Sequence, residues 1–215
     1  MIYIIDEKNI RQANYGWNEE RFESHVEDVK PIHSIEKLQE ISTEELFRKD
    51  NIILFHDSFF DVSKNKKTKE SDSLKHRLKN RSEDSKIVFF SGSYAGRSIE
   101  NENYAEMHVS WVYKNLNFFI DKKKQGDLDL RYLAFGKNYL YEQIDEIRTN
   151  IWRYLYTKDT LKEKFELPLK VVDDIVNIVS LTGVETDIED IETEPKTASY
   201  FKYRINDIIK RGLHE

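Results

Sequence analysis

Three short apolar runs constrain the fold of this chain more than any other feature. IYII, IILF and IVFF begin at residues 2, 52 and 87, and each is followed within one or two residues by polar side chains. Consecutive apolar residues indicate strands that are buried on both faces. Helix-like stretches separate the runs, so the pattern predicts a parallel sheet covered by helices on both sides.

Two more segments complete a predicted five-stranded sheet in a doubly wound α/β fold. VKPI, at 29–32, is expected to enter as a strand and to continue as a helix to residue 41, with Ser34 as the N-cap. LNFFIDKKK, at 116–124, is the last strand candidate. Helices are expected at 73–80 and at 106–116, the latter with Met107 and Trp111 facing inward.

The remaining residues predict a different, helical region. Apolar residues recur at helical spacing over 130–157, which predicts one long helix with a weak point at Gly136. Further helices are expected at 168–183, which ends at Gly183, and at 198–213. We therefore predict two domains, an α/β domain over 1–128 and a helical C-terminal region over 129–215.

Composition limits the classes of function. The chain has 215 residues, no Cys and a net charge of -6. The lack of Cys excludes disulfides and Cys-ligated metals and fits a cytoplasmic location. We expect neither a signal peptide nor a membrane partner, because the N-terminal apolar run is short and none reaches a bilayer-spanning length. The overall charge does not favour nucleic acid as a partner.

Polar side chains are predicted to converge at one edge of the sheet. In parallel sheets, binding sites lie at the carboxyl ends of the strands. These ends carry three acids, a hydroxyl and a lysine, namely Asp6, Glu7, Asp57, Ser91 and Lys122. The group as a whole indicates a functional site, although each member alone is common at a strand end.

This arrangement resembles the receiver domain of two-component response regulators over residues 1–125, through the segments IIDE, ILFHD, VFFSG and FFIDK. The resemblance implies a flavodoxin-like fold and a Mg²⁺ site formed by Asp6, Glu7 and Asp57, with the backbone carbonyl of Phe59. Magnesium suits such a site because it prefers oxygen ligands.

The same resemblance implies phosphoryl transfer to Asp57. The carboxylate would accept the phosphoryl group, and Ser91 and Lys122 would contact that group. A carboxylate needs a neighbouring cation for this reaction, because phosphate oxygens repel it.

Departures from the receiver pattern indicate a divergent member, a pseudo-receiver. Lys123 follows Lys122 where a proline is usual, His56 precedes the acceptor, and the loop after Asp57 is rich in lysine. Gly16-Trp17, soon after the acidic pair, together with a helical region, is similar to regulatory parts of bacterial conflict systems. We therefore expect a non-enzymatic regulatory module with a protein partner, either a kinase or a conflict-system component. The helical region would carry partner binding or form a homo-oligomer.

A ribonuclease is the alternative from another class of protein. IDEKN resembles the start of PIN-like or NYN-type metal-dependent ribonucleases. Two-metal hydrolysis would require Asp6, Asp57 and Asp61 to converge. Basic residues over 64–81 would contact RNA phosphates. Manganese-dependent RNA cleavage would distinguish this alternative from a receiver.

Overall fold

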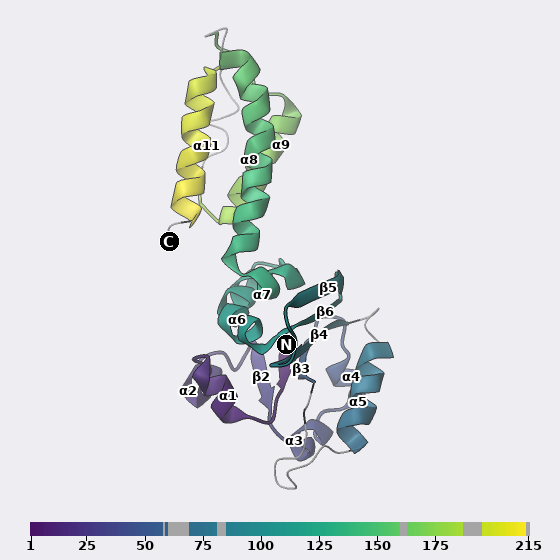
Figure 1. The fold of residues 1–215 in the computed structure, drawn as a ribbon. Helices are drawn as coiled ribbons and strands as arrows, with labels where there is room; N and C mark the ends of the chain where they lie inside the picture. The colour runs from purple at the N-terminus through teal and green to yellow at the C-terminus, as the bar shows by residue number, and fades with distance from the viewer. Residues whose placement is uncertain (58, 60–68, 81–84, 160–162, 187–194, 214–215) are drawn as a thin grey trace. The chain divides into compact units, whose positions relative to one another are not determined.

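A computed structural model of the chain describes residues 1–57, 59, 69–80, 85–159, 163–186 and 195–213 (Figure 1). It divides into two compact units, Met1–Gly136 and Lys137–Glu215. The predicted boundary between residues 128 and 129 falls ahead of a short helix, Leu130–Phe135, that belongs to the first unit. None of the described helices is both long and apolar enough to cross a bilayer.

Within the described residues, unit 1 contains one six-stranded sheet in the order β2-β1-β3-β4-β6-β5. Its strands are β1 Ile2–Ile5, β2 Val29–Ile32, β3 Ile52–His56, β4 Lys86–Ser91, β5 Arg97–Asn101 and β6 Tyr104–His108. All neighbouring strands pair in parallel except β5, which pairs antiparallel with β6 at the edge. The prediction of a mostly parallel α/β sheet is confirmed, and the predicted number of five strands is wrong.

Helices cover both faces of this sheet (Figure 1). The helices of unit 1 are α1 Asn9–Asn14, α2 Glu19–Glu23, α3 Ile35–Gln39, α4 Thr43–Leu46, α5 Lys69–Asn80, α6 Val109–Lys124 and α7 Leu130–Phe135. Alternate residues of β1 show the double burial. Tyr3 and Ile5 join a core with α3, α4 and α5, whereas Ile2 and Ile4 point to the other face, and all four are buried.

The strand predicted at 116–124 is wrong, because those residues belong to α6. Six buried residues of α6 recur at helical spacing, Val109, Val112, Tyr113, Leu116, Phe119 and Ile120. The short apolar run FFI fits a buried strand as well as a buried helix segment when it is read without the residues before it. The predicted helix over 106–116 starts instead as strand β6, which pairs with β5 across the polar turn at residues 102 and 103.

Unit 2 contains three described helices that pack on one another, α8 Lys137–Asp159, α9 Leu169–Thr182 and α11 Ala198–Leu213. Ile151, Ile175 and Ile205 are buried between them. The helices predicted near 168–183 and 198–213 are confirmed. The helix predicted over 130–157 is interrupted at Gly136, which separates α7 from α8.

Gly136 is a position where both the backbone conformation and a close neighbour oppose a side chain. Its φ is +61°, and an added Cβ would lie 2.6 Å from Oδ1 of Asn115. We expect Gly136→Ala to lower the free energy of unfolding by about 2 kcal/mol, because the alanine would be strained and would displace Asn115. Gly126→Ala is the control, since Gly126 also has a positive φ but has open space around it. Urea denaturation should show a clearly smaller loss for Gly126→Ala, and equal losses would contradict the role of Asn115.

Candidate functional site

The carboxyl edge of the parallel strands carries a group of polar and charged side chains. Asp6 and Glu7 follow β1, His56 ends β3 and Asp57 follows it, and Ser91 ends β4. The strand ends beside these are occupied by histidines, His33 after β2 and His108 at the end of β6. Buried strands force these side chains to one edge, as the rule for parallel sheets predicts.

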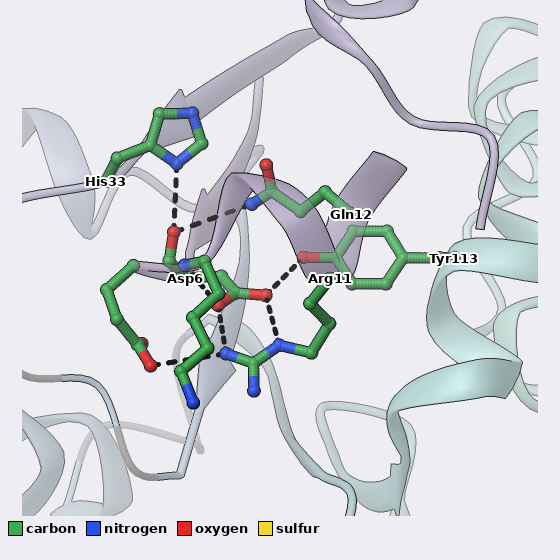
Figure 2. Close-up of polar contacts among 7 residues, drawn as sticks. Asp6, Arg11, Gln12, His33 and Tyr113 are labelled. Carbon is green, nitrogen blue, oxygen red and sulfur yellow. Dashed lines mark hydrogen bonds and ion pairs between the residues drawn. The ribbon is translucent and has the colours of Figure 1, made fainter. Parts of the chain in front are cut away.

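Asp6 is the centre of the site, and its carboxylate is fully buried (Figure 2). The guanidinium of Arg11, in α1, forms an ion pair with this carboxylate, with Nε 3.2 Å from Oδ2. The hydroxyl of Tyr113, in α6, donates to Oδ2 at 2.7 Å, and the backbone N–H of Lys8 donates to Oδ1 at 3.1 Å. Burial, and then the charge of Asp6, raise the pKa of Tyr113 well above its usual value. Both carboxylate oxygens are therefore already hydrogen-bonded.

A second layer of side chains holds the backbone of this centre. Nδ1 of His33 lies 2.9 Å from the carbonyl oxygen of Asp6, and Gln12 donates a long hydrogen bond of 3.5 Å to the same oxygen (Figure 2). Because a carbonyl only accepts, Nδ1 of His33 carries the proton. The indole of Trp17 donates to the carbonyl of Tyr113 at 2.9 Å. These contacts connect β2, α1 and α6 to Asp6.

Glu7 and His56 complete a compact cluster with Asp6. One ligand atom from each of the three lies within 4.8 Å of the others. Oε1 of Glu7 accepts from Arg11 at 3.3 Å, whereas no hydrogen bond from the described residues reaches the buried Oε2. Burial raises the pKa of Glu7. Burial also lowers the pKa of His56 from 6.5 to about 4, so its imidazole is neutral at pH 7.

Asp57 is held separately from this cluster. Its carboxylate forms an ion pair with the ammonium of Lys75, in α5. Its backbone N–H donates to the carbonyl of Phe90 at 2.9 Å, which fixes it beside the end of β4. The pKa of the Tyr94 hydroxyl is raised, mainly by burial and next by the negative charge of the nearby Asp57. A lysine therefore already neutralises the predicted phosphoacceptor.

The other predicted site residues have different positions. Ser91 lies at the expected strand end and is buried, with its hydroxyl 2.9 Å from that of Ser93. Phe59 is fully buried, and its ring packs against Phe55 in the core. Asp61 lies outside the described residues, as do residues 64–68 and 81 of the predicted basic stretch.

Lys122 does not lie at the carboxyl edge. It belongs to the last turn of α6, which starts at the carboxyl end of β6 and runs 16 residues, or about 24 Å, away from it. Its neighbour Lys124 pairs with Asp28, which directly precedes β2 at the opposite edge of the sheet. Lys122 is buried over the ring of Tyr132, and burial lowers its pKa. His108, and not Lys122, lies at the end of β6, the strand next to β4.

With their oxygens paired as in this structure, these residues do not form the Mg²⁺ site that the receiver resemblance implies. Magnesium prefers oxygen ligands in a regular octahedron, whereas the cluster offers two carboxylates and an imidazole. Arg11, Tyr113 and a backbone N–H already use the oxygens of Asp6. Asp57, which the receiver arrangement requires as a ligand, is not among the three clustered residues.

The sequence interpretation missed the cations of the site. Arg11 lies four residues after Glu7, a spacing that allows contact on one helical turn. The spacing is visible in the sequence, but Gly16 and the aromatic residues beside it make the segment after Glu7 a poor match to a continuous helix. Lys75 and Tyr113 had no local signal, since they lie 18 and 107 residues from their partners.

Comparison with known proteins adds no further assignment. No protein-family model, curated protein or solved structure matches the chain. The function is therefore argued from the contacts of the site.

Proposed function

We propose that unit 1 is a receiver-like regulatory module whose switch edge is held by its own side-chain cations. The observation that supports this is the pair of ion pairs at the edge, Arg11 with Asp6 and Lys75 with Asp57. In a receiver, Mg²⁺ and a phosphoryl group would neutralise and contact the corresponding carboxylates. Here two helices supply the positive charges, so Asp6 and Asp57 are each paired without either group.

Such an edge can act as a switch without phosphoryl chemistry. A regulatory change needs an element with two arrangements and a local change in charge or packing that favours one of them. Arg11 and Lys75 sit on α1 and α5, so exchanging either ion pair would shift a helix relative to the sheet. A protein partner that offers its own charges is the expected trigger. We place partner binding in the helical unit, as the sequence predicts.

No observation favours the ribonuclease alternative. It requires Asp6, Asp57 and Asp61 to bind metal together. Asp6 and Asp57 are each in an ion pair, and Asp61 lies outside the described residues. Manganese-dependent RNA cleavage stays a prediction from sequence and is not our proposal.

A titration with Mg²⁺ and beryllofluoride tests the proposed function. Beryllofluoride mimics a phosphoryl group on aspartate, and ¹⁹F NMR detects the bound form. We expect wild type to form no adduct, because Lys75 neutralises Asp57 and Arg11 occupies Asp6. The double variant Arg11→Gln, Lys75→Gln should form one that depends on Asp57. Lys49→Gln, an exposed lysine away from the edge, is the control and should behave like wild type.

Two outcomes would overturn the proposal. An adduct in wild type that Asp57→Asn abolishes would show an ordinary phosphorylatable receiver. A double variant that stays folded, as judged by circular dichroism, yet forms no adduct would show that the two cations do not hold a receiver-like edge.

A further inference from the structure

A groove of about 690 Å³ lies between α1, α2 and the edge strand β2, on the far side of the residues that hold Asp6. Trp17, Phe22 and Val29 form its buried apolar floor. Ile10 and Val26 lie on its margin and are 79% and 68% exposed. An apolar groove of this volume is within the range of small-molecule sites, which is roughly 300–1,000 Å³.

The free edge of β2 argues against an added strand as the occupant. A peptide that extends a sheet needs backbone donors and acceptors along the edge. Alternate residues of a strand direct their backbone groups to opposite sides, and Lys30 and Ile32 direct theirs toward β1. On the outer side, the N–H of Val29 donates to His25 at 2.8 Å, and Pro31 has no N–H. The edge therefore offers no donor at these positions.

The charges at the groove favour an anion on the side of the sheet. Lys37 lines this side and forms no ion pair with any of the described residues, whereas the ammonium of Lys30 lies over the ring of Tyr3, on the opposite face of the sheet. His33 also lines the groove, with Nδ1 committed to Asp6, which leaves Nε2 for a ligand. Glu19 and Glu23 line the opposite wall on α2, where they are exposed. The apolar floor thus has the cation of Lys37 on one side.

We propose that this groove binds a small amphiphile with an apolar body of aromatic size and a single anionic group. The body lies on Trp17 and Phe22, and the anion faces Lys37. This site is separate from the carboxylate edge and does not depend on the receiver-like function.

Binding in the groove reaches the carboxylate edge through direct contacts. Three lining residues also hold the centre of the edge, since His33 and Gln12 contact the carbonyl of Asp6 and Trp17 contacts the carbonyl of Tyr113. A ligand that moves any of the three changes a hydrogen bond to Asp6 or to its partner. The groove is therefore a position from which a small molecule regulates the edge.

The test uses 8-anilinonaphthalene-1-sulfonate, which has an aromatic body and one sulfonate, with indole N–H signals in ¹⁵N NMR as the readout. The chain has three tryptophans, so binding at Trp17 is resolved from binding elsewhere. We expect the Trp17 signal to shift saturably with the dye, and the amide of Asp6 to shift with the same concentration dependence. N-phenyl-1-naphthylamine, which lacks the sulfonate, should bind at least several-fold more weakly.

Matched variants locate the site. Ala13→Phe places a ring in the groove and should weaken binding of the dye at Trp17 about tenfold or more. Asn14→Phe is the control, because it adds the same ring to α1 outside the groove. Lys37→Gln should reduce the preference for the sulfonate, and Lys49→Gln should not. A Trp17 signal that does not move, or that moves equally in Ala13→Phe, would overturn the site. A shift at Trp17 without one at Asp6 would overturn the coupling.

Discussion

Replacing Arg11 by glutamine should lower the free energy of unfolding of unit 1 by about 3 kcal/mol, the low end of the range for breaking a buried ion pair. The carboxylate of Asp6 is fully buried and the side chain of Arg11 is 18% exposed. Removing the guanidinium leaves a buried charge that, among the described residues, keeps only Tyr113 and a backbone N–H as donors. Urea denaturation followed by tryptophan fluorescence measures the loss, with Trp152→Phe as the background to remove the signal of unit 2.

Two controls separate the buried charge from a general loss of packing. Arg131→Gln breaks a half-exposed ion pair with Asp129 in the same unit and should cost less than about 1 kcal/mol. Adding Asp6→Asn to Arg11→Gln should recover part of the loss, because the uncompensated charge is then gone. A loss below about 1 kcal/mol for Arg11→Gln would show that water reaches Asp6 and that Arg11 does not hold the edge.

The strands of the sheet could be predicted wherever their apolar runs were continuous. β1, β3 and β4 are buried on both faces, so their sequences are continuous apolar runs. Such runs lack the spacing of apolar residues that would indicate an amphipathic helix. β5 could not be found in this way, since its residues are largely exposed at the edge of the sheet. Its partner β6 continues directly into α6, and the apolar residues of the two elements overlap in one helix-like pattern. The error at 116–124 followed from that overlap.

The acids of the site could be predicted because they follow these strands, but their partners could not. The topology of a parallel sheet is sufficient to bring Asp6, Glu7 and Asp57 to one edge. Their ionic partners come from helices, and the packing of a helix decides which of its lysines reaches a given acid. Several lysines precede and follow Lys75, and nothing local to the sequence distinguishes it from them. Lys122 looked equivalent to the receiver lysine only while its segment was taken for a strand.

The stability of unit 1 should fall between pH 6.5 and pH 4 because of His56. Burial lowers the pKa of His56 to about 4 in the folded chain, compared with 6.5 in the unfolded chain. Between these values the unfolded chain binds the proton and the folded chain does not, so the free energy of unfolding decreases as the pH falls. The full difference corresponds to about 3 kcal/mol. Glu7 acts in the opposite direction, since burial raises its pKa and favours the folded chain as it takes up a proton.

Replacing His56 by phenylalanine isolates the histidine from these opposing effects. The imidazole packs edge-on against Phe90 at 5.2 Å, a contact that a phenylalanine ring can keep. We expect urea denaturation at a series of pH values to show a steeper loss of stability for wild type than for His56→Phe below pH 6.5. His76→Gln, exposed on α5, should retain the wild-type dependence. Parallel curves for wild type and His56→Phe would mean that His56 takes up a proton as readily in the folded chain. A charged imidazole would then stand beside Asp6 and Glu7, and the edge would not depend on Arg11 for its balance.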